Sequence, residues 1–381
     1  MSIDSVQVPA LLRDLARVPD PRDPRGVIHP LVSLLAVAVA AVLAGARSVT
    51  AIGEWVADVP ATVLAALGVV RDPFTGFHRV PDATTIGRVL ADLDGDAFDT
   101  AVSQWLVGLH TPPADQPPHR RAYATDGKTL RGSGPAGSQV HLLAAVDHHT
   151  GAVVAQTAVD GKTNEITRFV PLLADLDLAG AVVTADALHT QREHARWLVE
   201  QRNAGYVFVV KKNQPTLYHQ VKHLPWGKVP IDDEVHTRGH GRDDIRRLQV
   251  VTVARSIGLD FPYAVQAVRV RRRRMNLTTG RWSTVTVYAV TNFTADQATP
   301  AELADWLRGH WTIEVLHHVR DVTFAEDASQ LRTGNAPRAM ATLRNAAVSV
   351  LRLAGTTTIA RALRHNARDP HRPLRLLGLL T

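Results

Sequence analysis

The chain contains no cysteine among its 381 residues. A disulfide scaffold, a cysteine nucleophile and a zinc site with cysteine ligands are therefore excluded. Any bound metal must be held by carboxylates, histidines or backbone oxygens.

The sequence also lacks a long apolar run, because the longest one, residues 31–45, has 15 residues. As a helix this run would extend about 22 Å, less than the ~30 Å hydrocarbon core of a bilayer. We expect a buried helix there and no membrane partner. Residues 1–18 carry acids and lack the basic start and apolar centre of a secretory signal, so we expect a cytoplasmic protein.

Neither sign of charge is in large excess. The chain has 43 Lys and Arg against 36 Asp and Glu, a net charge of +7, which is compatible with a polyanionic partner. Hydrophobic residues make up 45% and charged residues 21%, as is typical of soluble globular proteins. The length suits two or three domains.

Composition divides the chain into five parts. We predict a helical N-terminal domain over 1–110, a proline-rich linker over 111–121, the first part of an α/β catalytic core over 122–215, a β-rich insertion over 216–300, and a C-terminal helical part of the core over 301–381.

The core has the element order of a mixed α/β sheet. Apolar runs predict strands at 140–146, 152–159, 181–184 and 206–210, of which the first two form an antiparallel hairpin, and strand-like runs in the insertion at 248–254, 263–270 and 284–290. Amphipathic patterns predict helices at about 6–18, 163–176, 191–202, 300–320 and 336–353.

Two aspartates stand where apolar strands meet polar turns. Asp126 follows the run AYAT, and Asp186 follows AVVTA. A carboxylate at such a strand end points into the crevice where α/β sheets bind ligands, although each aspartate could instead cap the turn that follows. If the two strands are neighbours, a third acid would complete an oxygen site for Mg²⁺ or Mn²⁺.

The candidate third acid is Glu314, in a predicted helix. His310, Glu314, His317 and either Arg320 or Asp321 recur at helical spacing, which puts a polar stripe on one helix face. This stripe either faces solvent or packs toward the sheet.

Several separated motifs occur in an order that resembles the DDE transposases of bacterial insertion sequences, and among them the H-repeat-associated group. They are PDPRDPRG at 19–26, ATDGKTLRGS around Asp126, DGKTNEI at 160–166, TADALHTQ around Asp186, KKNQPTL at 211–217, and HWTIE with HHVRDVTFAEDA at 310–328. The resemblance covers nearly the whole chain.

The resemblance implies a ribonuclease H-like core with two Mg²⁺ or Mn²⁺ ions held by Asp126, Asp186 and Glu314. It also implies a β-strand insertion between the second and third acids. The expected function is to bind double-stranded DNA at element ends and target, as a homodimer, and to catalyse strand cleavage and strand transfer. The N-terminal domain then either helps to recognise the ends or is a structural cap.

The sequence departs from the family pattern around the third acid. Related transposases carry a Tyr, Arg, Glu, Lys signature, and the corresponding positions around Glu314 hold Leu307, His310 and Asp321. Asp321 and Glu326 are therefore rival acids, and we prefer Glu314. A two-metal nuclease without strand transfer and an inactive DNA-binding descendant are the alternative functions; terminal inverted repeats beside the gene would favour transposition.

Basic residues near the acids and in the insertion are the candidate DNA contacts. They are Lys128, Arg131, Lys211, Lys212, His310 and Arg320 near the acids, and Arg271, Arg272, Arg273 and Arg274 in the insertion. Residues 236–281 contain 11 arginines against three acids, an imbalance greater than that of the whole chain. If 271–274 form a strand, alternate arginines lie on opposite faces. The other interpretation of each of these basic residues is an ordinary position on the solvated surface.

Overall fold

The structure is a computed structural model that describes residues 8–109, 120–159, 164–239, 241–253 and 258–380. The predicted linker at 111–121 therefore lies outside the described residues except for its last two. The same is true of the first residues of the predicted helix at 6–18, of 160–163 in the DGKTNEI motif, and of Arg255 in the insertion.

Nine strands of the described residues form one mixed sheet. They are β1 (Ala122–Thr129), β2 (His141–Asp147), β3 (Val153–Val159), β4 (Val182–Ala185), β5 (Gly205–Val210), β6 (Asp233–Gly239), β7 (Arg242–Thr252), β8 (Gln266–Asn276) and β9 (Trp282–Thr291). Their order across the sheet is β3-β2-β1-β4-β5-β9-β8-β7-β6. Strands β1 to β3 are antiparallel, β4 and β5 run parallel to β1, and β9 pairs antiparallel with β5.

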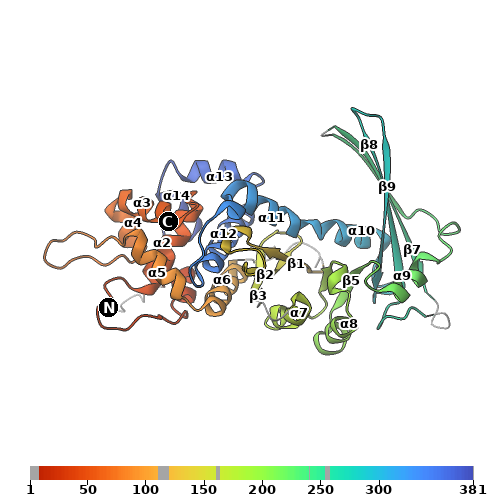
Figure 1. Cartoon of the computed structure of the whole chain (residues 1–381), viewed down its shortest axis with the longest axis horizontal. Helices are drawn as coiled ribbons and strands as arrows, with labels where there is room; N and C mark the ends of the chain where they lie inside the picture. Colours follow the sequence, from red (N-terminus) through yellow and green to blue (C-terminus); the bar gives the residue numbers. More distant parts are fainter. Residues whose placement is uncertain (1–7, 110–119, 160–163, 240, 254–257, 381) are drawn as a thin grey trace, which may run out of the picture.

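The predicted strands and the β2–β3 hairpin are confirmed within a few residues, and the mixed α/β class with them. Strand β6 is an addition to the predicted strands, because its sequence DEVHTRG lacks an apolar alternation. The predicted insertion is β-rich, but its strands continue the sheet of the core instead of forming a sheet of their own. Figure 1 shows them extending as long ribbons from one end of the molecule.

Three helices follow the core strands: α7 (Glu165–Leu173), α8 (Arg192–Arg196), which continues as a π-helical turn over Trp197–Gln201, and α9 (Pro215–Lys222). The predicted helix at 300–320 is two helices, α10 (Pro300–Gly309) and α11 (Trp311–Phe324). The two meet where Gly309 packs so closely on His148 that a side chain would not fit. The helix predicted at 336–353 is confirmed as α12 (Ala336–Leu353).

The remaining helices form a body at the other end of the molecule (Figure 1). They are α1 (Ala10–Leu15), α2 (Leu31–Leu43), α3 (Val49–Asp58), α4 (Ala61–Ala66), α5 (Ala83–Asp92), α6 (Gly95–Leu109), α13 (Ile359–Asn366) and α14 (His371–Leu376). Helix α2 is the predicted buried helix, and residues 34–43 in it are at most 2% exposed. None of the described helices is long and apolar enough to cross a membrane.

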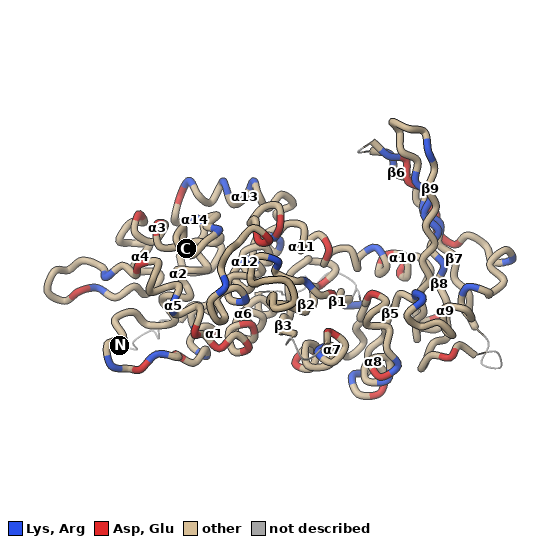
Figure 2. Tube along the Cα trace, in the orientation of Figure 1, with Lys and Arg blue, Asp and Glu red and all other residues tan. Residues whose placement is uncertain are grey.

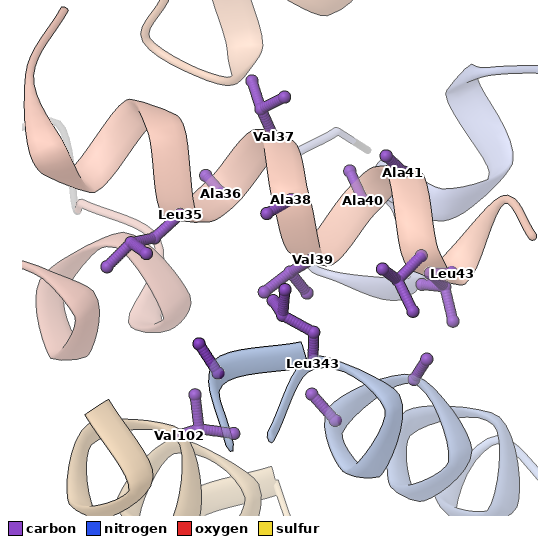
Figure 3. Packing of buried hydrophobic residues seen from close by; sticks show 14 of the residues in the cluster. Leu35, Ala36, Val37, Ala38, Val39, Ala40, Ala41, Leu43, Val102 and Leu343 are labelled. Carbon is purple, nitrogen blue, oxygen red and sulfur yellow. The ribbon is translucent and has the colours of Figure 1, made fainter. Parts of the chain in front are cut away.

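The N-terminal helices and the C-terminal helices share one hydrophobic core. Leu343 of α12 and Val102 of α6 face the apolar side chains of α2 (Figure 3), and Leu363 and Leu374 of the last two helices belong to the same cluster. The segment 1–110 is therefore packed together with the chain's C-terminal end. Its role in recognising DNA ends stays a prediction.

Candidate active site

Two neighbouring parallel strands bring the predicted aspartates to the same edge of the sheet. In the register of β1 and β4, Thr125 pairs with Ala185, so the next residues are Asp126, inside β1, and Asp186, directly after β4. The predicted strand end is confirmed for Asp186 and is wrong for Asp126, because β1 continues to Thr129 by pairing with β2. Both strands are held by buried side chains such as Ala124 in front of Asp126. The sheet therefore fixes the backbone positions from which the two carboxylate side chains extend.

Helix α11 brings Glu314 to the same region. It packs on β1 through a buried face that includes Ile313 and Leu316, both 0% exposed. Glu314 and Asp186 line one pocket of about 310 Å³ together with Lys211. Asp186 and Glu314 thus line the same pocket, although 127 residues separate them in the chain, and their charges act on Asp126 of the neighbouring strand.

The carboxylates at this site are not neutralised by the protein. Burial, with smaller contributions from the charges of Asp186, Glu165 and Glu314, raises the pKa of Asp126 to about 6, against the hydrogen bond from the Gly127 backbone. Burial also raises the pKa of Glu314, while Lys211 opposes that shift. Among the described residues, no Lys or Arg forms an ion pair with Asp126, Asp186 or Glu314. An added cation would relieve this repulsion.

His317 lies beside Asp126, with its Nδ1 3.7 Å from Oδ2 of the aspartate. Burial, helped by the charges of Arg320 and Lys128, lowers the pKa of His317 to about 3. The imidazole is therefore uncharged at neutral pH and does not neutralise Asp126.

Asp186 also caps the turn that follows it, because its Oδ1 accepts a hydrogen bond from the Leu188 N–H at 2.8 Å. The same turn is braced from the KKNQP motif: the Asn213 side chain donates to the Ala187 carbonyl, and Gln214 donates to the Thr190 carbonyl at 2.9 Å. The capping and the site interpretations of Asp186 are thus compatible.

Glu165, from the NE pair of the DGKTNEI motif, is a residue of this region that sequence reasoning missed. Its Oε1 lies 2.8 Å from Nε2 of His141, and its Oε2 lies 3.2 Å from Nε2 of His189. His141 is on β2, next to β1, and His189 is three residues after Asp186. Glu165 therefore links the two chain segments that carry the aspartates.

Gly127 makes room for this carboxylate. A Cβ on Gly127 would lie 2.5 Å from Cδ of Glu165, closer than real side-chain atoms approach. Burial raises the pKa of Glu165, but hydrogen bonds from His141 and His189 outweigh it and lower that pKa to about 2. Glu165 is ionised next to Asp126. The DGKTNEI motif marks Glu165 in the sequence, but nothing in the sequence indicates that His141 and His189 are its partners.

The two rival third acids have partners of their own. Glu326 is 2% exposed and bound by Arg320 at 2.8 Å and by Arg344 at 3.0 Å. Burial raises the pKa of Glu326, but these two guanidinium charges outweigh it and lower the pKa overall. Asp321 accepts hydrogen bonds from Nζ of Lys128 at 2.7 and 2.8 Å. This geometry favours Glu314.

Three of the predicted DNA contacts are corrected by their surroundings. Arg320 is 1% exposed and held by Glu326, and the Lys128 side chain is 9% exposed and held by Asp321. His310 bonds the Thr184 hydroxyl at 3.1 Å, and burial lowers its pKa to about 4, so it carries no charge for a phosphate. In this conformation none of the three is a free cation at the surface.

The other basic candidates near the acids remain accessible. We call the pocket that contains Asp186 and Glu314 the acid pocket. Lys211 lines it, and Lys212, the next residue, is exposed. The Arg131 side chain is 77% exposed, with Asp327 3.4 Å away. Their contact with DNA stays a prediction.

The arginine run of the insertion lies in β8 and alternates between the two faces of the sheet, as predicted. Arg272 and Arg274 both reach Asp244 of β7, at 3.4 and 2.8 Å. Arg273 points to the other face, where its guanidinium lies 4.7 Å from the ring centre of Trp282. Arg271 is exposed.

One face of the insertion leads to the acids. The pocket that contains Asp186 and Glu314 extends to Arg246 and Arg272, and a second pocket of about 480 Å³ continues from those two arginines. We call the basic lining of the second pocket the arginine groove; its members are Arg238, Arg242, Arg246, Arg272 and Arg274. Figure 2 shows the Lys and Arg positions along these strands.

Comparison with known proteins identifies the class to which this fold and site belong. The family described as "Transposase DDE domain" matches residues 117–350, and the family described as "DDE_Tnp_1-associated" matches residues 12–106. The chain therefore belongs to the DDE transposase family, and its function is that of a transposase.

Its relatives include proteins of Escherichia coli of nearly the same length. It is 28% identical to "Putative transposase YncI" of strain O157:H7 over 368 residues, covering 91% of this chain and 88% of that protein. It is also 28% identical to "H repeat-associated putative transposase YhhI" of strain K12, covering 91% of each. The predicted resemblance to the H-repeat-associated group is confirmed.

A comparison of structures aligns 92% of the chain with 72% of the piggyBac transposase in its synaptic complex with hairpin DNA. The TM-score is 0.44 at 10% sequence identity, too low to define a shared fold.

Proposed function

We propose that this transposase binds double-stranded DNA at element ends and target, and that Asp126, Asp186 and Glu314 carry metal-dependent strand cleavage and strand transfer. The observation that carries the proposal is that Asp186 and Glu314 share a pocket beside Asp126, with no ion-paired Lys or Arg on any of the three among the described residues. Burial raises the pKa of Asp126 to about 6, and shifted pKa values of this kind cluster at functional sites.

We further propose that residues 122–215 and the helices after the insertion form a ribonuclease H-like core. Support comes from the strand order β3-β2-β1-β4-β5, in which three antiparallel strands are followed by two strands parallel to β1. The predicted acids then lie within β1, directly after β4, and on a helix that packs on β1.

The residues of the site fit Mg²⁺ or Mn²⁺, which prefer carboxylate oxygens. Asp126, Asp186 and Glu314 would hold two ions, although no three such side chains in the described part of the chain already stand close enough together to form a finished metal cluster. Bound ions would activate the attacking oxygen and stabilise the leaving one.

The protein's own groups then position the DNA. Lys211 stands beside Asp186 and Glu314, where its ammonium group can hold a phosphate next to the acids. The arginine groove supplies further phosphate contacts along the insertion, and its shared wall with the acid pocket gives the DNA a continuous path. We expect a homodimer on DNA, because both ends of an element must be joined.

The test is cleavage of a supercoiled plasmid that carries the DNA flanking the gene, in the presence of Mg²⁺. We expect Asp126→Asn and Asp186→Asn each to abolish cleavage while a gel-shift assay shows nearly unchanged DNA binding. Full cleavage by either variant would remove that residue from the site. Wild-type cleavage without joined products would favour the nuclease that lacks strand transfer.

A further inference from the structure

The hairpin between α4 and α5, residues 70–80, exposes two phenylalanines. The Phe74 side chain is 94% exposed and the Phe77 side chain 78%, more than any other large apolar residue of the described chain. We call residues 70–80 the phenylalanine hairpin. Figure 1 shows the loop between α4 and α5 extending from the helical body at the end opposite to β8 and β9. Nothing in the acid site uses it.

The phenylalanine hairpin is internally braced. Asp72 accepts hydrogen bonds from the backbone N–H groups of Phe74 at 2.8 Å and Thr75 at 2.9 Å, and from Arg79 at 2.7 and 3.0 Å. These bonds lower the pKa of Asp72 to about 2. Arg71 and His78 pair across the base of the loop. The two rings are therefore presented by a pre-formed turn, which reduces the entropy lost on binding.

The hairpin carries a small positive excess, with two arginines and one acid. Arg71 and Arg79 flank the two rings and are exposed, while the only acid of the hairpin, Asp72, is already bound by Arg79. Figure 2 shows both basic and acidic positions on this loop.

We propose that the phenylalanine hairpin binds duplex DNA, with Phe74 and Phe77 inserted between base steps and the arginines on the flanking phosphates. Apolar rings beside cations are the means by which proteins wedge open a minor groove. A second copy of this chain fits less well, because a two-fold interface would bring the arginines against their own copies. The proposal rests on the DNA-binding part of the proposed function.

The test compares the full-length wild type with Phe74→Ala/Phe77→Ala, and with Val107→Ala as control, since Val107 is an exposed apolar residue of α6. The probes are duplexes from the DNA on each side of the gene, with 2-aminopurine at successive positions. We expect the double variant to bind about tenfold more weakly for each ring removed. The rise in 2-aminopurine fluorescence that reports unstacking should disappear. The salt slope of binding should not change, because no charge is removed.

Wild-type affinity and fluorescence in the double variant would overturn the proposal, as would loss of a dimer in sedimentation without any change in DNA binding. Asp126→Asn keeps the two proposals distinguishable. If cleavage depends on Asp126 while the hairpin variant binds and unstacks DNA normally, the proposed function stands and the wedge fails. The melting temperature checks that each variant is folded.

Discussion

Helix α11 takes part in two groups of carboxylates that the protein treats in opposite ways. Glu326 is buried between Arg320 and Arg344, which neutralise it fully. Glu314 meets Asp126 and Asp186 with no ion-paired Lys or Arg in the described chain. The first arrangement stabilises the fold, because a buried charge with two partners keeps its neighbours in place. The second leaves the acids without an ion-paired cation, and burial raises the pKa values of Asp126 and Glu314, which is the arrangement expected of a functional site.

Exchanging Glu for Gln in each group should give the largest contrast. We expect Glu314→Gln to lower cleavage on the order of 10³-fold with no loss of stability, because it removes charge that the site needs for metal binding. Glu326→Gln should lower the free energy of unfolding by about 3–5 kcal/mol, because two arginines stay buried without their counter-ion. Urea unfolding and plasmid cleavage measure the two effects. Intact cleavage by Glu314→Gln would return Asp321 and Glu326 to consideration.

The pH dependence of stability should sharpen the same comparison. The folded-state pKa of Asp126 is raised to about 6 from 3.8, so the folded protein binds the proton more tightly than the unfolded chain. Ionised Asp126 therefore lowers the free energy of unfolding above pH 6, by at most about 3 kcal/mol. This loss disappears as the pH falls from 6 toward 4 and Asp126 becomes protonated. The side chain is 30% exposed, so we expect less than the maximum.

The measurement is the free energy of unfolding of the wild type minus that of Asp126→Asn, at pH 5 and pH 7.5. Asp126→Asn should be the more stable protein at pH 7.5 without divalent ions, and saturating Mg²⁺ should reverse the order. A difference that is the same at both pH values would mean that Asp126 is not under charge repulsion.

A substitution at Glu165 tests whether this residue positions the segments that carry Asp126 and Asp186 or only stabilises the fold. Glu165→Gln cannot accept hydrogen bonds from both His141 and His189, so the segments carrying Asp126 and Asp186 lose their link. We expect cleavage to fall about 10–100-fold, the usual loss for a residue that orients metal ligands, and more Mg²⁺ to be needed for half-maximal rate.

A matched control lies one residue earlier. Asn164 caps the same helix by accepting from the Thr167 N–H at 3.2 Å, so Asn164→Ala should cost about 1 kcal/mol of stability without changing the Mg²⁺ requirement. Equal Mg²⁺ dependence in Glu165→Gln and Asn164→Ala would reduce Glu165 to a structural role.

The arginines of β8 should give the smallest effect. The sequence predicts phosphate contacts for 271–274, with alternate arginines on opposite faces if they form a strand, and the sheet does divide them into two pairs. Arg272→Gln/Arg274→Gln, in the arginine groove, should flatten the salt dependence of DNA binding by up to about 0.9 log units for each phosphate that is no longer neutralised, equally on specific and random DNA. Arg271→Gln/Arg273→Gln, on the other face, should change it less. The reverse ranking would place the DNA on the opposite face of the insertion.

Sequence patterns predicted most of the core because local chemistry decides it there. The apolar run before Asp186 ends in a turn, and the β2–β3 hairpin carries its own turn signal, whereas β1 continues past Asp126 to Thr129. Strand β6 was missed because its residues are polar on both faces; pairing with β7 makes it a strand. The break between α10 and α11 falls where Gly309 contacts His148, 161 positions earlier in the chain.

The sequence by itself determined which residues can do the chemistry: without cysteine, a metal site has to use carboxylates, histidines or backbone oxygens, and the two aspartates directly follow buried apolar runs. Only the tertiary structure decided which acids stay unpaired. Lys128, Arg320 and His310 look like free polar groups in the sequence, but folding binds them to Asp321, Glu326 and Thr184. The physical reason is that a charge acts through its neighbours within a few ångströms, and long-range packing chooses those neighbours.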